Sequence, residues 1–235
     1  MYGVKLKVWG EYACFTRPEM KAERVSYDVI TPSAARGILE AIYWKPQMRW
    51  VVDRLLVFNP IRFTNIRRNE IGCKIPARKV ETAMKGKPSA LGIAVEKNRQ
   101  QRASLILRDV CYGIEAHLEV LDSNGPEDKP EAKHLDQFRR RAQRGGYYHH
   151  PYLGTREFPA YFELVEEFPP CHESLRGDRD LGFMLHDIVF VPDQDGRIVE
   201  SNKGKRLSAQ PRFRRFIMRD GIIDVPPLEA EGGVS

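Results

Sequence analysis

The sequence predicts an α+β fold in which a βαββαβ unit comes first and a smaller antiparallel β unit follows. Up to about residue 170, apolar patterns typical of strands and helices occur in the order strand, helix, strand, strand, helix, strand. Short strand patterns with Asp-Gly turns follow. The first unit has the ferredoxin-like, RRM-like order of RNA-recognition folds. We therefore expect two domains, 1–170 and 171–235, the second ending in a frayed tail.

The first strand and the first helix have clear patterns. Residues 3–9 alternate between apolar and basic side chains, which is typical of a half-buried strand. A helix is expected over 32–44, because Thr31 can cap its start and Pro32 suits its first position. Apolar residues then recur at 3.6-residue spacing and predict a face buried in the core. Pro46 disfavours helical geometry at the residue before it and turns the chain away.

The remaining elements of the first unit follow in order. Residues 50–68 predict one long strand or two strands, broken at Asn59-Pro60. Residues 104–120 alternate as a strand, and the glycines at 145–146 end a second helix that begins near residue 130. A last strand is expected within 157–168. In the second unit, turns are expected at 195–196 and 220–221.

Positive charge is concentrated in one segment, which we expect to be an insertion or long loop at 71–103. The chain has a formal net charge of +6. Eight Lys or Arg and only two acids lie within 71–103, so this segment has the same net charge as the whole chain. Such a segment suits a phosphate backbone, because each neutralised phosphate releases condensed counterions. A solvated basic loop has the same composition, and composition alone does not choose between them.

The sequence lacks the motifs that usually identify several classes of protein. The sequence has no Walker A loop, no GxSxG elbow and no HExxH, and its four cysteines form no CxxC pair. No apolar run approaches the roughly 18 residues of a membrane span, and the N-terminus lacks the pattern of a signal peptide. We expect a cytoplasmic protein that acts without a membrane, a metal ion or another cofactor.

Arginines and aromatic residues alternate in the segment 138–161, "FRRRAQRGGYYHHPYLGTREFPAY". Arginine side chains that bind phosphates, next to rings that stack on bases, are typical of proteins that bind single-stranded or loop RNA. A basic helix followed by aromatic side chains in the core would have the same pattern. The residues that we expect to bind RNA from this segment are Arg139, Arg140, Arg141, Arg144, Tyr147, Tyr148 and Arg156.

Tyr43, Lys45 and His117 are the candidate catalytic residues. His117 alternates to the polar face of its strand, where a lone histidine is more often a satisfied polar residue than a catalyst. If RNA is the substrate, a catalytic role for His117 becomes more plausible, because the 2′-hydroxyl of RNA can attack the neighbouring phosphate. The protein must then move two protons and stabilise negative charge. A histidine suits proton transfer, a tyrosine can donate a proton, and a lysine can stabilise the charge.

Four stretches resemble a known family: "RVSYDVITPSAARGILEAIYWKP", "QRASLILRDVCYGIEAHLE", "HHPYLGTREFPAYFE" and "LGFMLHDI". They are similar to the CRISPR-associated RNA endonucleases of type I-C systems, the d variant of the fifth Cas family. The resemblance implies metal-independent cleavage of precursor CRISPR RNA at the base of the repeat hairpin, leaving a 5′-hydroxyl and a 2′,3′-cyclic phosphate. It also implies that the protein stays on the 5′ handle with the backbone and large subunits of the interference complex.

The resemblance assigns catalysis to a tyrosine at the end of the first helix, here Tyr43, and to a histidine of the third strand, here His117. Some members have a lysine just before that histidine, where this chain has Ala116. We take Lys45 as the substitute, and expect Trp44 to pack beneath the pair. Further residues expected to bind RNA are Arg36, Arg67, Arg68, Lys74, Arg78 and Lys79.

The missing lysine leaves a rival hypothesis open. In that hypothesis the protein binds the CRISPR RNA handle without cutting it, as a structural subunit. Non-specific binding of duplex DNA through 71–103 is compatible with either function.

Overall fold

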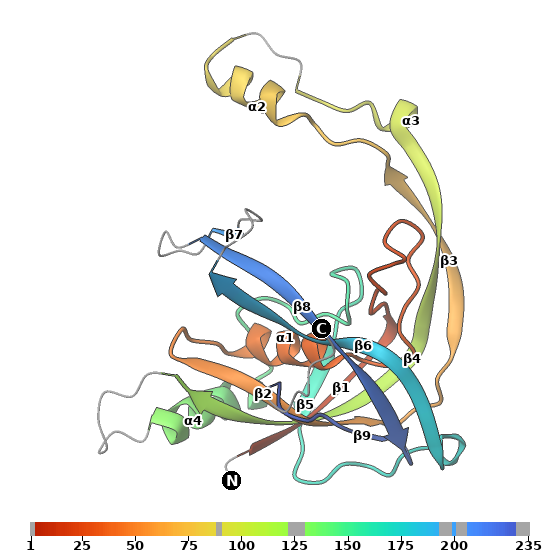
Figure 1. The fold of residues 1–235 in the computed structure, drawn as a ribbon, viewed down its shortest axis with the longest axis vertical. Coiled ribbons are helices and arrows are strands. Elements are labelled where there is room, and N and C mark those ends of the chain that lie inside the picture. Colours follow the sequence, from red (N-terminus) through yellow and green to blue (C-terminus); the bar gives the residue numbers. More distant parts are fainter. Residues whose placement is uncertain (1–2, 88–90, 122–129, 193–198, 201–205, 229–235) are drawn as a thin grey trace.

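The computed structural model describes residues 3–87, 91–121, 130–192, 199–200 and 206–228. Within these ranges, nine strands form one sheet in the order β5-β1-β4-β2-β9-β8-β6, with β3 paired to β4 and β7 paired to β8 (Figure 1). The strands are β1 (Gly3–Ala13), β2 (Met48–Val57), β3 (Phe63–Ile71), β4 (Arg99–Val120), β5 (Tyr161–Leu164), β6 (Asp178–Pro192), β7 (Val199–Glu200), β8 (Arg206–Arg219) and β9 (Ile222–Asp224). The helices are α1 (Pro32–Ile42), α2 (Ala77–Met84), α3 (Val95–Asn98) and α4 (Pro130–Gln143), with a 3₁₀ turn, η1 (Glu173–Leu175). The mixed α and β composition that the sequence predicts is confirmed.

The core lies between one face of β5-β1-β4-β2 and the helices α1 and α4. The strand expected over 3–9 is present and continues to Ala13, with its apolar side chains buried on the helix side. The antiparallel register of β1 with β4 pairs Leu6 with Ile114, and both side chains are fully buried. From α4, Leu135 and Phe138 enter the same core. The alternation therefore leaves the polar side chains of β1 and β4 on the opposite face.

Helix α1 ends at Ile42, two residues earlier than expected. Its start is as predicted, because the Thr31 side chain accepts a hydrogen bond from the Ala34 amide at 3.2 Å. Tyr43 already has extended backbone, with φ −155° and ψ 125°. The indole of Trp50 explains this end, because its Nε1 donates to the Tyr43 carbonyl at 2.9 Å. The expectation that Trp44 packs beneath the site is wrong: Trp44 is 50% exposed, whereas Trp50 is buried.

The basic segment 71–103 includes the far part of an ordered arm, not only a loop. Strand β3 pairs with the first half of β4 from Phe63 opposite Leu107 to Ile71 opposite Arg99. The hairpin curves away from the body, with α2 and α3 at its far end (Figure 1). No residue of β3, α2 or α3 is buried, so the arm projects its charge into solvent.

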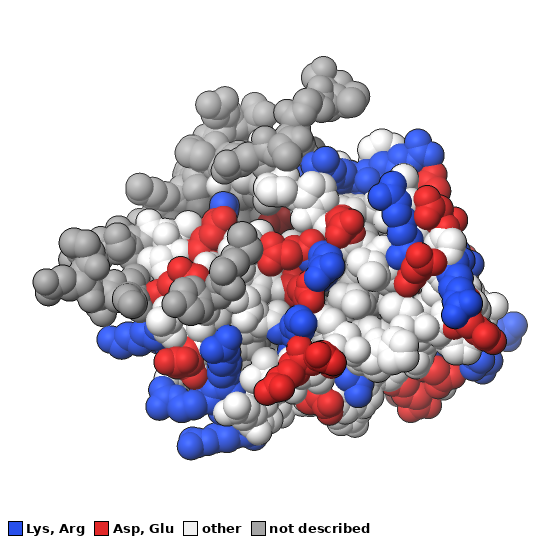
Figure 2. Space-filling view, turned by 90° about the horizontal axis from the view of Figure 1, so that it is seen from below, with Lys and Arg blue, Asp and Glu red and all other residues white. Residues whose placement is uncertain are grey.

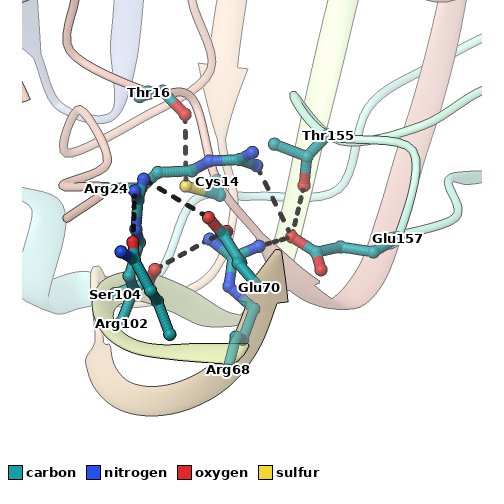
Figure 3. Close-up of polar contacts among 10 residues, drawn as sticks. Cys14, Thr16, Arg24, Arg68, Glu70, Arg102, Ser104, Thr155 and Glu157 are labelled. Atoms are coloured by element: carbon teal, nitrogen blue, oxygen red, sulfur yellow. Dashed lines mark hydrogen bonds and ion pairs between the residues drawn. The ribbon is translucent and has the colours of Figure 1, made fainter. Parts of the chain in front are cut away.

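A polar network holds the base of this arm against the body (Figure 3). The guanidinium of Arg68 pairs with the Glu157 carboxylate, lies 3.6 Å from Glu70, and donates to the Ser104 hydroxyl at 2.8 Å. Arg24 lies 3.8 Å from the same Glu157 carboxylate. Glu70 and Ser104 belong to the β3–β4 hairpin itself, so the ion pair of Arg68 with Glu157 is the contact that ties Arg68 to the loop before β5.

The short strand β9 joins the C-terminal hairpin β6–β8 to the first unit. It pairs with β2, where Ile223 is opposite Leu55, and with the end of β8. The turn predicted at 220–221 is confirmed, with positive φ at both Asp220 and Gly221. The turn expected at 195–196 and the expected C-terminal tail lie outside the described residues. No helix in the described part of the chain is long and apolar enough to cross a membrane.

A pair of glycine substitutions tests the packing of the loop before β5. Gly154 and Gly177 both have positive φ, at 86° and 85°. A Cβ at Gly154 would lie 2.1 Å from the Cys14 carbonyl oxygen, whereas a Cβ at Gly177 would meet nothing within 4 Å. We expect Gly154→Ala to lower the free energy of unfolding by about 1–3 kcal/mol more than Gly177→Ala. Urea titration of both variants measures the difference, and equal losses would contradict the packing described.

Candidate active site

The candidate catalytic residues Tyr43 and His117 lie in two adjoining hollows. The histidine hollow is lined by Gly3, Val4, Lys5, Asp53, Glu115, Ala116, His117, Arg139, Gln143, Leu164, Val165 and Glu166. The tyrosine hollow is lined by Tyr43, Lys45, Lys133, His134, Asp136, Gln137, Arg139, Arg140, Arg141 and Gln143. Arg139 and Gln143 of α4 belong to both. The structure thus brings Tyr43 and Lys45 together in one hollow beside α4, whereas His117 lines the other hollow, on the face of the sheet opposite the helices.

His117 is held by a carboxylate from the neighbouring strand. Its Nδ1 lies 2.8 Å from Oδ1 and 2.9 Å from Oδ2 of Asp53. A carboxylate only accepts hydrogen bonds, so Nδ1 is the donor, and Nε2 lies 3.8 Å from Oε1 of Glu119. The register of β2 with β4 shifts between Val52 and Arg54, which makes Asp53 the extra residue of a bulge. Bulges redirect side chains, and this one puts the Asp53 carboxylate beside the imidazole.

Two cations, Lys5 and Arg139, line the histidine hollow. Lys5 is opposite Glu115 in the β1–β4 ladder, and its Nζ donates to the Glu166 carbonyl at 3.1 Å. Arg139 reaches from α4 and donates to the Gly3 carbonyl at 3.3 Å. Glu115, whose carboxylate accepts from Arg54 at 2.6 Å, keeps the charge of this hollow mixed. Lys5 was not among the residues expected at the site, because its alternation indicates only an exposed strand face.

Tyr43 is paired with a histidine that the sequence analysis missed. The Tyr43 hydroxyl lies 2.8 Å from Nδ1 of His134 on α4. Burial raises the pKa of Tyr43, although the Arg141 guanidinium, 5.3 Å from the centre of its ring, opposes this. Burial lowers the pKa of His134, and the positive charges of Lys133 and Lys45 lower it further. At neutral pH the pair therefore consists of a protonated phenol and a neutral imidazole.

The residues expected to bind RNA lie in four places in the fold. Arg139, Arg140 and Arg141 line the tyrosine hollow, and Arg144, Tyr147 and Tyr148 follow them at the end of α4. Tyr148 is 85% exposed, and its amide donates to the Ala41 carbonyl at 2.8 Å, which ties this loop to α1. Seen from below, basic side chains lie on both sides of the molecule, with acidic ones interspersed among them (Figure 2).

The other expected RNA-binding residues lie apart from the hollows. Arg67 and Arg68 are on β3, and Lys74, Arg78 and Lys79 are near the far end of the arm. Arg156 is in the loop before β5, beside Glu157. Arg36 of α1 pairs with Glu40 at 2.8 Å and with Asp187 of β6 at 2.5 Å. The guanidinium groups of Arg36 and Arg68 therefore form ion pairs within the protein.

Asp53 and His134 are the residues that sequence reasoning missed. The alternation of β2 is interrupted at the polar pair Asp53-Arg54, which has three apolar residues on each side, and this break is the weak sequence signal of the bulge. His134 gave a weak signal: it lies one turn before Phe138 on the face of α4 that meets the core. In the part of the chain that the structure describes, no three His, Cys, Asp or Glu side chains group as metal ligands would.

Comparison with known proteins gives a consistent result. The sequence model of the Cas5d family, described as CRISPR-associated protein (Cas_Cas5), matches residues 3–226. A relative from Mannheimia succiniciproducens is 49% identical over 97% of this chain and 96% of its own length. One from Thermus thermophilus is 45% identical over 96% of this chain and 92% of its own length. Each of the two relatives is named "CRISPR pre-crRNA endoribonuclease Cas5d".

Solved structures share the fold at low sequence identity. A functionally uncharacterized protein from Streptococcus mutans has a TM-score of 0.65 at 20% identity, covering 99% of this chain and 96% of its own. A structure described as a CRISPR-associated protein has a TM-score of 0.64 at 22% identity, covering 99% and 95%. The match of the family sequence model over nearly the whole chain, together with two relatives at 45% and 49% identity, shows that the chain belongs to the Cas5d family of CRISPR-associated proteins.

Proposed function

We propose that this protein is an endoribonuclease that cleaves precursor CRISPR RNA at the base of the repeat hairpin by attack of a 2′-hydroxyl. The observation that carries the proposal is the pairing of His117 with Asp53, next to a hollow that contains Tyr43 and Lys45. Two relatives of nearly full length, named pre-crRNA endoribonucleases, support the same substrate and activity. No cofactor is needed, because RNA provides the nucleophile.

The reaction needs two proton transfers and one site of positive charge. The 2′-oxygen loses its proton and bonds to the adjacent phosphorus, the bond from phosphorus to the 5′-oxygen breaks, and the 5′-oxygen takes up a proton. The products are a 2′,3′-cyclic phosphate and a 5′-hydroxyl. Nε2 of His117 and the hydroxyl of Tyr43 are the two groups that exchange protons. Lys45 and Arg139 stabilise the negative charge that develops on the phosphate oxygens.

After cleavage the protein stays on the 5′ handle as a subunit of the type I-C interference complex, beside its backbone and large subunits. The strand order β5-β1-β4-β2 with α1 and α4 on one face supports a ferredoxin-like arrangement for 1–170. Residues 171–235 are proposed as the small second β domain. The basic arm adds a surface for the phosphate backbone of RNA or of duplex DNA.

Cleavage of repeat RNA in excess EDTA tests the function. We expect natural RNA to be cut and RNA with a single 2′-deoxy substitution before the scissile phosphate to stay whole, because its nucleophile is missing. Tyr43→Phe and His117→Ala should each lower the cleavage rate by about 10²-fold and leave RNA binding nearly unchanged, as expected for lost acid-base catalysis. Single-turnover rates and filter binding measure the two quantities.

Two matched variants control this experiment. Tyr161→Phe removes a hydroxyl from an exposed residue outside both hollows, and His172→Asn removes an imidazole but keeps a side chain that can cap η1. Both should cleave at the rate of the unmodified protein. Tight binding of both RNAs without cleavage of either would reject the enzyme and favour the handle-binding subunit. Equal losses of binding and cleavage in His117→Ala would reject its catalytic role.

The salt dependence of RNA binding tests the arm. Replacing Lys74, Arg78 and Lys79 together with alanine should lower the slope of log K against log salt by up to about 2, because each lost single-strand phosphate contact removes about 0.7. Replacing Lys74 and Lys79 with arginine keeps the charge and should leave the slope unchanged. An unchanged slope in the triple alanine variant would mean that these charges are solvated and bind no phosphate.

A further inference from the structure

We infer that the loop after α4 and one side of α1 bind an unpaired nucleotide of single-stranded RNA, whose base enters a pocket beside Gly37. This inference deepens the proposed function and rests on it, because it names a second place where the protein holds its RNA. The residues that line the pocket belong to neither of the two hollows that contain the candidate catalytic residues.

The pocket is built from aromatic rings, hydroxyl groups and small side chains. It lies between the start of α1, the chain that precedes α1, and β6, and its volume is about 370 Å³. This volume is near the lower end of the range for small-molecule sites and suits a single nucleobase. The rings are those of Phe15, Tyr27 and Tyr152, and hydroxyl groups come from Thr16 and Ser33. Rings can stack on a base, and hydroxyl groups can both donate to and accept from its polar edge.

Gly37 leaves one wall of this pocket open. It lies in the middle of α1, where a glycine is less favourable than an alanine, and it is exposed. A Cβ at Gly37 would meet nothing within 4 Å. Ser33, one turn earlier, and Ala41, one turn later, lie on the same side of the helix. The missing side chain therefore leaves space for a ligand on this side of α1.

The loop after α4 runs along the same side of α1 and presents a row of rings. The Tyr148 amide donates to the Ala41 carbonyl at 2.8 Å, and Tyr152 lines the pocket together with Gly37. Between these two points, the ring centres of Tyr148 and His149 are 6.2 Å apart, and those of His149 and Tyr152 are 6.3 Å apart. Tyr148 and His149 are exposed. Successive bases of a single strand can stack on such a row, which ends at the pocket.

Backbone contacts hold the end of this loop in place. The Cys14 amide donates to the Leu153 carbonyl at 3.0 Å, and the Leu153 amide donates to the Phe158 carbonyl at 2.8 Å. The Leu153 side chain is fully buried. The ring of Tyr152 is therefore attached to a backbone that is ordered before RNA binds, which lowers the entropic cost of binding.

Positive charges flank the row of rings. Arg144 precedes the loop and Arg156 follows it, and both are exposed. The Arg17 guanidinium lies 4.7 Å from the centre of the Tyr27 ring, although Asp28, 3.8 Å away, offsets part of its charge. Rings suit a base and arginines suit the phosphates on either side of it. The site thus fits a nucleotide within a longer RNA better than it fits an acidic peptide, which has charge but no base.

Repeat RNAs that each lack one unpaired base test the inference, with the 2′-deoxy substitution that prevents cleavage present in all of them. Filter binding to the unmodified protein identifies the positions at which loss of the base weakens binding. At one of these positions we expect a loss of about 10-fold, typical of a base that stacks on a ring. Tyr152→Ala should bind the intact RNA about 10-fold more weakly, and should bind this abasic RNA as well as the intact RNA, because both changes remove the same contact.

A variant that fills the pocket provides a second test. Gly37→Leu should show the same loss and the same insensitivity to the abasic position, while its melting temperature should not fall, because leucine favours a helix more than glycine does. Gly92→Leu adds the same atoms at another position where a Cβ meets nothing within 4 Å. Tyr152→Phe keeps the ring, and Tyr161→Ala removes an exposed ring outside the pocket. These three controls should bind intact and abasic RNA as the unmodified protein does.

Three results would overturn the inference. Unchanged binding of intact RNA by both Tyr152→Ala and Gly37→Leu would show that the pocket holds no base and would favour a protein ligand. A loss in Tyr152→Ala that is equal for the intact RNA and for every abasic RNA would show that the ring contacts none of these bases. A loss in Gly92→Leu as large as that in Gly37→Leu would assign the effect to added apolar surface. If the unmodified protein binds no repeat RNA, the proposed function itself fails and the inference fails with it, a result distinct from the first three.

Discussion

The indole of Trp50 is the contact on which the candidate site depends. Trp50 is 1% exposed and joins three elements. It belongs to β2, and its ring packs on Phe138 of α4. Its Nε1 donates a hydrogen bond to the carbonyl of Tyr43, the residue that follows α1. Truncation of a buried tryptophan generally costs about 3–5 kcal/mol. Here it would also free the end of α1 from α4, and with it the contact between Tyr43 and His134. The hydrophobic core and the proposed chemistry thus share one side chain.

The histidine hollow depends on a different constraint, the antiparallel register of β2 with β4. That register places His117 opposite Val51, and the bulge that follows brings Asp53 to the same imidazole. The site therefore combines a contact made by a sheet with a contact made by two helices. Arg139 of α4 lines both hollows, and its guanidinium donates to the Gly3 carbonyl at the start of β1.

Much of the fold could be predicted from local patterns. The alternation of β1 and β4, the cap at Thr31 and the Asp-Gly turn at 220–221 each depend on neighbouring residues, and each is present. What the sequence did not predict depends on contacts between distant residues. The early end of α1 comes from Trp50, and the ordered arm comes from the pairing of β3 with β4 and from the ion pairs of Arg68. Trp44 was expected to pack beneath Tyr43 because the two are neighbours in the sequence. Of the two tryptophans, it is Trp50 that is buried in the core, whereas Trp44 is half exposed.

For the site, sequence reasoning found the residues whose chemistry suits RNA cleavage but not those that support them. Tyr43, Lys45 and His117 could be named from residue type and resemblance. Asp53 depends on a bulge, and His134 depends on how α4 packs against α1, so each has at most a weak local signal. The same holds for Lys5, which comes near Glu115 only through the register of β1 with β4.

The most direct measurement is a structure of the protein bound to its repeat RNA, with one 2′-deoxy substitution that prevents cleavage. The scissile phosphate is expected beside Arg139, in the hollow that contains His117 or in the one that contains Tyr43. A scissile phosphate bound on the arm, or on the C-terminal hairpin far from Arg139, would contradict the assignment of both hollows to the reaction.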